Sequence, residues 1–352
     1  MDTAQGLDAQ IKKLEESLNS AKLPPPLMEK ASGMLDLLKA SIKQGGDYTN
    51  LENIKNYLDI IIQIPFSKET ADVLDLNHAK QVLDKNHYGL APVKNRILEY
   101  LSSLILNTKE GKKINRAPII CLTGLVGTGK TTLAYSIAET LGRNFQRIPL
   151  GGMGDVRDIR GQSRAFADAE PGQIVKKLIS AKSKNCVILL DELDRVTEGA
   201  RSDIMGALVE LLDPEQNQAF TDHYVDYPVD LSKILFISTA NNTTNISTAV
   251  LDRLEIIQMP AYSDEEKSVI GKNYLLPKIM DEAGLPPNVL KIDDNVWPEI
   301  IRPLGYDSGI RSLERTVEGI CRKVARAIVE GKVGQGAIIT VNIGNIKEFI
   351  AQ

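Results

Sequence analysis

Cysteine and histidine are scarce in this chain of 352 residues, and each scarcity argues against a class of site. The three cysteines lie far apart and two of them fall within apolar runs, so a disulfide framework is not expected. The three histidines are too widely spaced for a typical zinc site.

Strong net charge and long apolar runs are also missing. The net charge is −4, so no basic footprint for nucleic acid is visible. No apolar run reaches the roughly 18 residues of a membrane span, and the acidic first thirty residues do not resemble a secretory signal. A charged fraction of 25% is that of a soluble globular protein, the length allows two or three domains, and a cytoplasmic location without membrane contact is expected.

The first part of the chain is predicted to be a helical arm over residues 1–57. Its pattern is helical and charged from Asp8 to about Tyr57 and is interrupted by Pro24-Pro25-Pro26 and by Gly45-Gly46-Asp47. We predict two helices joined by the proline turn and lying outside the main core.

Residues 58–260 alternate between strand-like and helical patterns. Such alternation predicts an α/β domain in which helices cover both faces of a parallel sheet. Ligand chemistry is then expected at the carboxyl ends of the strands. The predicted strands are Ile119–Thr123, Phe145–Leu150, Val187–Glu192, Ile234–Asn241 and Ile256–Met259.

Helical patterns dominate after Pro260, so a small α-helical domain is predicted over residues 261–345. Ser263 and Glu266 form a capping-box pattern, a long helix is predicted from about Ser308 to Glu330, and a short strand at Ile338–Val341. Residues 346–352 are interpreted as the start of a truncated linker.

A complete phosphate-binding pattern, G-x-x-x-x-G-K-[ST], follows the first predicted strand. Its glycines allow backbone N–H groups to turn toward phosphates, the lysine adds a charge at the β- and γ-phosphates, and the Thr131 hydroxyl suits Mg²⁺. The following helix points the positive end of its dipole at the anion. This Walker A loop predicts ATP and Mg²⁺ as cofactors. The predicted contacts are Gly124, Leu125, Val126, Gly127, Thr128, Gly129, Lys130, Thr131 and Thr132.

Two carboxylates, Asp191 and Glu192, end an apolar strand-like run. Because unpaired buried charge is costly, two acids at this position are poorly explained by structure alone. Together with the phosphate loop, Asp191 is predicted to hold Mg²⁺ through water and Glu192 to orient and polarise the attacking water. The alternative is a strand end whose acids reach solvent.

Asn241 ends another apolar run, and its amide suits a γ-phosphate oxygen and the lytic water. An asparagine after a strand is also a common turn residue. The phosphate loop and acidic strand in the same chain favour the catalytic interpretation.

These motifs together resemble the AAA+ ATPases, and longer stretches are similar to the ATPase module of Lon-type ATP-dependent proteases. The resemblance covers residues 50 to about 345. The similar stretches are His87-Tyr88-Gly89-Leu90, Pro149-Leu150-Gly151-Gly152, Asp155–Gly161, Leu212–Asn217, Asp222-His223-Tyr224, Leu251–Glu255 and Gly309–Arg315.

The resemblance implies roles for four further residues. Arg253 would be an arginine finger acting in the neighbouring subunit, and Arg311 would touch the γ-phosphate in its own subunit. His87 and Tyr88 would lie at the adenine. For the arginines, the alternative is a surface ion pair with a nearby acid. A finger that acts only between subunits implies oligomerisation, and the family suggests a homo-hexamer.

The family's substrate-gripping loop is altered in this chain. Phe166 keeps the expected aromatic residue, but Ala167 replaces the aliphatic neighbour and Asp168 the glycine. A ring of Phe166 side chains is expected to grip a polypeptide by apolar contact, while Asp168 and Glu170 make the channel acidic. Translocation is therefore expected to be weak or biased toward basic substrates.

The family's peptidase domain and large amino-terminal substrate-binding domain have no counterpart in this sequence. A fragment of a longer protease and a stand-alone ATPase both stay open. The preferred hypothesis is a ring-forming unfoldase that acts on unfolded proteins or serves a separate peptidase. The alternative is a nucleotide-gated interaction module that pulls nothing. DNA binding, a trait of the Lon-like family, keeps nucleic acid as a less favoured partner.

Overall fold

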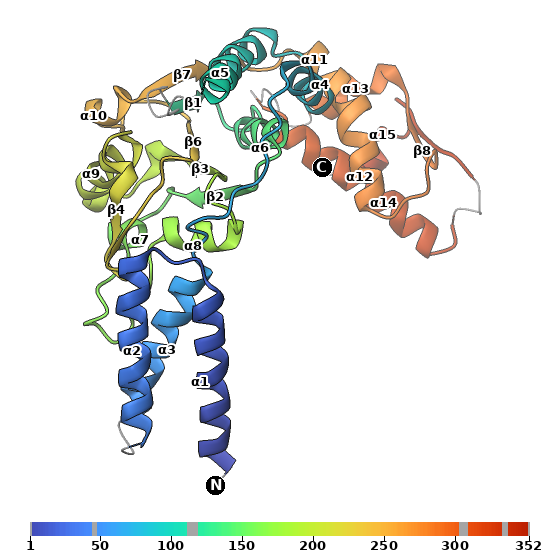
Figure 1. Ribbon diagram of the computed structural model, residues 1–352. Coiled ribbons are helices and arrows are strands. Elements are labelled where there is room, and N and C mark those ends of the chain that lie inside the picture. Colours follow the sequence, from blue (N-terminus) through green and yellow to red (C-terminus); the bar gives the residue numbers. More distant parts are fainter. Residues whose placement is uncertain (1, 44–47, 111–118, 303–308, 333–336, 351–352) are drawn as a thin grey trace.

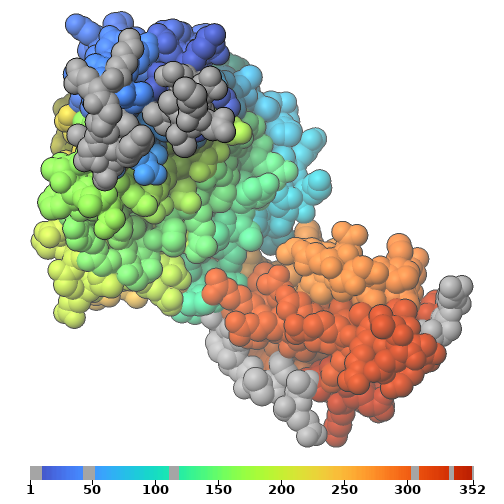
Figure 2. Space-filling view, turned by 90° about the horizontal axis from the view of Figure 1, so that it is seen from below, coloured from blue at the N-terminus to red at the C-terminus, as the bar shows by residue number. Residues whose placement is uncertain are grey.

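A computed structural model describes residues 2–43, 48–110, 119–302, 309–332 and 337–350. Three parts follow one another along the chain: a helical arm, an α/β domain and a smaller, mostly helical lid (Figure 1). The space-filling view shows the arm packed on the α/β domain and the lid as a separate lobe (Figure 2). The predicted helix start at Ser308 and the last two linker residues lie outside the described residues.

The arm contains three helices among the described residues, so the prediction of two was wrong. They are α1 (Asp2–Ser20), α2 (Pro25–Lys43) and α3 (Tyr48–Gln63). Proline favours the first turn of a helix, which explains why α2 begins within the proline run. The predicted interruption at Gly45-Gly46-Asp47 lies outside the described residues, between the end of α2 at Lys43 and the start of α3 at Tyr48. The arm core contains Leu14, Leu18, Leu27, Ala31, Leu35, Leu38, Leu58 and Ile61.

A parallel sheet forms the centre of the α/β domain, as predicted, and the structure shows five strands in the order β2-β3-β6-β1-β7. Because the strands are parallel, the residues that follow β1, β3 and β6 meet at one edge of the sheet. The strands are β1 (Ile119–Thr123), β2 (Phe145–Pro149), β3 (Val187–Asp191), β6 (Leu235–Ala240) and β7 (Leu254–Gln258).

Helices cover both faces of this sheet because alternate strand residues point to opposite sides. Ile120 and Leu122 pack with α4 (Leu76–Asn86), α5 (Ala91–Lys109) and α6 (Lys130–Leu141). Cys121 faces the other way, into the cluster of α8 and α9. The remaining elements of this domain are α7 (Arg157–Arg160), α8 (Gln173–Ala181), α9 (Arg201–Leu212), α10 (Thr248–Leu251), the hairpin β4 (Phe220–Asp222) and β5 (Tyr227–Val229), and the 3₁₀ turns η1 (Leu193–Arg195), η2 (Glu198–Ala200) and η3 (Asn217–Ala219).

The lid is built from helices and a two-stranded parallel pair. The predicted capping box is present, with Ser263 accepting from the N–H of Glu266. The predicted strand pairs with a strand that sequence reasoning missed. The elements are α11 (Asp264–Ile270), a π-helical turn (Gly271–Leu275), α12 (Leu276–Glu282), β8 (Leu290–Ile292), η5 (Asp294–Val296), α13 (Trp297–Ile301), α14 (Arg311–Val329), β9 (Ile339–Val341) and α15 (Ile346–Phe349). None of the helices in the described ranges has both the length and the apolar character that crossing a bilayer requires.

Candidate functional site

The loop between β1 and α6 has the backbone shape that its glycines allow. Gly127 and Gly129 adopt φ of 83° and 88°, in the left-handed region that suits glycine. Gly124 has a φ of 150°, and a Cβ there would lie 2.6 Å from the carbonyl oxygen of Met259. A side chain at Gly124 would therefore displace the loop from the end of β7.

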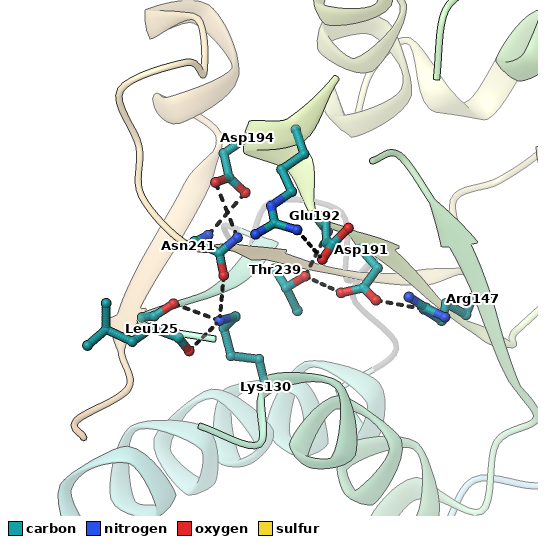
Figure 3. Close-up of polar contacts among 10 residues, drawn as sticks. Leu125, Lys130, Arg147, Asp191, Glu192, Asp194, Thr239 and Asn241 are labelled. Carbon is teal, nitrogen blue, oxygen red and sulfur yellow. Dashed lines mark hydrogen bonds and ion pairs between the residues drawn. The ribbon is translucent and has the colours of Figure 1, made fainter. Parts of the chain in front are cut away.

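Lys130 opens α6, and its ammonium is held between the loop and a neighbouring strand (Figure 3). It donates to the carbonyl oxygens of Gly124 and Leu125 at 2.6 and 2.9 Å and to Oδ1 of Asn241 at 3.1 Å. Burial lowers its pKa, as does Arg311, while Asp194 acts in the opposite direction. The structure thus brings together two residues that sequence reasoning assigned to one phosphate site.

The two acids at the end of β3 have different surroundings. Asp191 is buried: its Oδ2 accepts from Nε of Arg147 at 2.6 Å, and its Oδ1 accepts from the Thr239 hydroxyl. Both carboxylate oxygens are held, which fixes the orientation of this side chain. Asp191 is therefore suited to a structural or metal-orienting role.

Glu192 is held more loosely than Asp191. Its backbone is left-handed, with a φ of 60°, and its N–H donates to the Thr239 hydroxyl at 2.9 Å. The carboxylate accepts from Arg195 at 3.2 Å, and its other oxygen would lie 2.5 Å from a Cβ on Gly151. A non-glycine residue in the left-handed region is uncommon and often marks a functional site. The turn directs the carboxylate out of the strand.

Asn241 directly follows β6 and lies next to Lys130. Its backbone N–H donates to Oδ1 of the buried Asp194 at 3.0 Å, and its side-chain amide lies 3.5 Å from Oδ2 of the same residue. In this arrangement the amide nitrogen of Asn241 faces Asp194. The oxygen of the amide is left facing the Lys130 ammonium.

Sequence reasoning missed Arg147, Asp194 and Thr239, which orient the predicted residues. Thr239 was detectable only together with Ser238, because both are hydroxyl residues near the end of a buried strand and a buried hydroxyl requires a partner. Arg147 lies on a half-exposed strand, where an arginine is unremarkable. No local pattern distinguished it.

A pocket of about 1040 Å³ lies between the α/β domain and the lid above these residues. Large ligand pockets in proteins reach about this size. Of the predicted residues, it is lined by His87, Tyr88, Val126, Gly127, Gly129, Lys130, Thr131, Thr132, Asp191, Glu192, Asn241 and Arg311. The residues Gly124, Leu125 and Thr128 lie in the loop without lining the pocket.

The predicted adenine side combines a buried residue and an exposed one. The ring of His87 lies with Nε2 2.9 Å from the Ser136 hydroxyl, and burial, assisted by Lys94, lowers the pKa of His87 to about 4. This imidazole is therefore neutral near pH 7. Tyr88 packs edge-on against Tyr274 of the lid, with ring centroids 6.4 Å apart.

The lid touches the phosphate loop directly. Ile310 donates its N–H to the carbonyl oxygen of Gly127 at 3.0 Å. A Cβ on Gly309 would lie 2.5 Å from the carbonyl oxygen of Val126. Arg311 begins α14 two residues later and lines the pocket. Absence of a side chain at Gly309 is what allows this close approach.

Replacing Gly309 with alanine is expected to weaken nucleotide binding roughly tenfold. The added methyl group would separate the lid from the phosphate loop, and Arg311 would then lie too far from the nucleotide for its charged contact. Gly319→Ala is the matched control, because a Cβ there meets nothing within 4 Å. Binding of a fluorescent ATP analogue measures the effect. Equal affinities for the two variants would contradict this role of Gly309.

Arg253 and Phe166 do not line the pocket of their own chain. Arg253 donates to Oδ2 of Asp213 at 2.9 Å and to the carbonyl oxygen of Ala249 at 2.8 Å. Its hydrogen bond holds the pKa of Asp213 below the usual range. Phe166 is 60% exposed on the loop between α7 and α8.

Two protein-family models match the sequence of this chain. The model described as ATPase family associated with various cellular activities (AAA) matches residues 120–261, and the Lon protease AAA+ ATPase lid domain matches residues 281–336. The chain carries a Lon-type AAA+ ATPase module. The match begins in β1 and includes the phosphate loop, both acids and Asn241, while the second model covers most of the lid.

Curated relatives of the Lon-type module are named Lon protease. The protein of Lawsonia intracellularis (strain PHE/MN1-00) is 44% identical over 325 residues, which are 92% of this chain and 38% of that protein. The protein of Clostridioides difficile (strain 630) is 42% identical over 335 residues, or 95% of this chain and 42% of that protein. The chain spans about two fifths of the length of these relatives.

The pocket of the Lon-type module suits Mg²⁺ bound mainly by water. Thr131 and Asp191 both line it, and one hydroxyl with one carboxylate fits an ion that keeps several waters. Because both oxygens of Asp191 already accept hydrogen bonds, contact through water is favoured over direct coordination. Among the described residues, no group of three or more His, Cys, Asp or Glu side chains forms a metal site of its own.

Proposed function

We propose that the pocket binds ATP with Mg²⁺ and hydrolyses it. The observation that supports this most directly is the convergence of Lys130, Asn241, Asp191 and Glu192 at one edge of the sheet. Phosphate oxygens of the β- and γ-phosphates would replace the carbonyl oxygens of Gly124 and Leu125 as acceptors of the Lys130 hydrogen bonds. A bound Mg²⁺ would neutralise charge that develops on the phosphate oxygens.

Each polar residue then has a distinct role. Glu192 accepts a proton from the attacking water and orients it, which its loosely held carboxylate allows. Asn241 donates to a γ-phosphate oxygen once Lys130 has turned to the phosphates and the amide nitrogen has turned from Asp194. Arg311 contacts the γ-phosphate from the lid of the same chain, and His87 and Tyr88 flank the base.

Lys130→Ala tests this assignment. Because a charge-assisted hydrogen bond contributes about 1.5–3 kcal/mol, loss of the ammonium is expected to weaken ATP binding by about 10- to 150-fold. Titration with a fluorescent ATP analogue, together with phosphate release, measures both steps. Lys109→Ala, at an exposed position at the end of α5, is the control. Unchanged binding by Lys130→Ala would overturn the proposed site.

We further propose that Arg253 completes the pocket of a neighbouring copy in a ring, with a hexamer as the expected form. The lack of contact between Arg253 and its own pocket supports an action between subunits. We place the ring in the cytoplasm, where its three buried, unpaired cysteines stay reduced.

The energy of hydrolysis is proposed to unfold or remodel protein substrates, alone or together with a peptidase. Exposure of Phe166 supports this role, because a large apolar side chain at a loop apex suits contact with unfolded chain. ATP turnover that rises with added unfolded protein would support it. Slow turnover with ATP-dependent assembly would favour the nucleotide-gated interaction module instead.

A further inference from the structure

The loop that carries Phe166, here called the gripping loop (residues 162–171), is closed at its base. The N–H of Gln162 donates to the carbonyl oxygen of Glu170 at 3.0 Å. Beyond this pair, Gly172 donates to Oδ2 of the buried Asp222 at 2.7 Å, and a Cβ on Gly172 would lie 2.1 Å from the Ile159 carbonyl oxygen. The base is thus attached to the β4–β5 hairpin with no space for a side chain.

The middle of the gripping loop contacts the helical arm through Arg164. The guanidinium carbon of Arg164 lies 3.9 Å from the centre of the Tyr57 ring, which belongs to α3. It also lies near Asp226, with 3.9 Å between Arg164 and Oδ2 of that carboxylate. The same oxygen accepts from Lys30 of α2 at 2.7 Å. One carboxylate therefore joins the loop to a second arm helix.

The arm side of this contact is rigid. Tyr57 is fully buried, and its hydroxyl donates to the Val225 carbonyl oxygen at 3.0 Å. The Tyr57 and Tyr224 rings lie 6.1 Å apart. Ala169 of the gripping loop packs against the same apolar cluster as Leu58 and Ile61 of α3. In Figure 1 the light-green loop after α7 runs beside α2.

Phe166 sits between these attachments. It donates its N–H to the Ser163 carbonyl oxygen at 3.1 Å, and its own carbonyl oxygen accepts from Ala169 at 3.3 Å. Since Arg164 and Ala169 flank it and both contact the arm cluster, the position of the exposed ring follows that of the arm.

We infer that the helical arm positions the gripping loop, with Arg164 as the positioning residue, so that arm displacement changes the grip on substrate. This inference rests on the proposed function of Phe166. Because Arg164 packs on the Tyr57 ring of α3, a displacement of the gripping loop is expected to shift α3. A partner that moves α2 or α3 is expected to shift the position of the gripping loop in turn. Couplings between protein sites commonly change an equilibrium about 5- to 150-fold, which is enough to regulate substrate engagement.

The contact is tested first without reference to activity, by hydrogen exchange of the backbone amides of residues 163–169 in the full chain. Arg164→Ala is expected to raise exchange about tenfold, because partly buried cation–π contacts are among the stronger side-chain contacts. Tyr57→Phe keeps the ring face and should leave exchange near that of the wild type. Arg157→Ala is the control, because that exposed arginine pairs locally with Asp155. Unchanged exchange in Arg164→Ala overturns the inference.

Substrate engagement is tested next, with reduced and carboxymethylated lactalbumin as a permanently unfolded protein. The concentration that gives half-maximal stimulation of ATP turnover should rise about fivefold in Arg164→Ala and stay unchanged in Tyr57→Phe and Arg157→Ala. Unaltered stimulation with normal turnover would overturn the link to gripping while leaving the ATPase proposal standing. Absence of turnover in the wild type would instead count against the proposed function. The hydrogen-exchange measurement would still show whether Arg164 couples the gripping loop to the arm.

Discussion

Glu192→Gln protein is expected to bind ATP normally and to turn it over about 10²- to 10⁴-fold more slowly, since glutamine cannot accept the proton of the attacking water. The change is nearly isosteric, so the hydrogen bond between the Glu192 backbone and Thr239 stays intact. Asp191, which lies one residue earlier with both oxygens held, would still orient the ion. Phosphate release under saturating ATP measures the loss, and equilibrium binding of a fluorescent analogue measures affinity.

Glu198→Gln is the matched control for this prediction. Glu198 lies six residues further along the chain, in η2, and its side chain is exposed. Both variants remove one negative charge, so a general electrostatic effect would appear in both. Near-normal turnover in Glu192→Gln would show that the Glu192 carboxylate is not the general base. Asp194 would then be the next acid to test.

Arg253→Ala should lose about 10³- to 10⁵-fold in turnover and retain ATP affinity, because a guanidinium that meets the transferring phosphoryl group acts mainly in the transition state. The structure places this residue outside its own pocket and leaves its buried Nε without a hydrogen-bond partner in the part of the chain described. Arg96→Ala provides a control, since Arg96 forms an ordinary surface ion pair with Glu255.

Mixing the Arg253→Ala and Glu192→Gln variants tests whether Arg253 acts in a neighbouring subunit or in its own. Where the pocket of an Arg253→Ala subunit meets the arginine of a Glu192→Gln subunit, the shared site contains both an intact Glu192 and an intact Arg253. Random mixing in equal amounts should restore about a quarter of the sites. No recovery in assemblies that demonstrably contain both variants would show that Arg253 serves its own chain or a structural role.

The phosphate loop and the strands were predictable because their signals are local. The G-x-x-x-x-G-K-[ST] pattern and the apolar run before it are read from neighbouring residues, as are the paired acids after β3. The parallel sheet followed because strands alternate with helices along the chain. The domain boundaries at 57, 260 and 345 stay predictions: α3 continues to Gln63, while the family matches begin at residues 120 and 281.

The arm shows where local reasoning was insufficient. The proline run and the glycine pair were both visible interruptions, yet only one was interpreted as a helix boundary. Three helices fit because the apolar residues of α1, α2 and α3 complete one shared cluster. The strand β8 was missed for a related reason, since three residues are too few to show alternation and its partner β9 lies far along the chain.

The sequence by itself determined the phosphate-loop motif and the polar residues that follow the strands, and the proposed roles of these residues toward phosphate, Mg²⁺ and an attacking water follow from short patterns with a local physical meaning. Only the tertiary structure decided which residues orient them. Arg147 meets Asp191, Gly309 meets the phosphate loop, and Arg164 meets Tyr57 across separations of tens of residues or more. Such contacts depend on how elements pack, and packing is governed by shape and burial over the whole chain, which no short pattern contains.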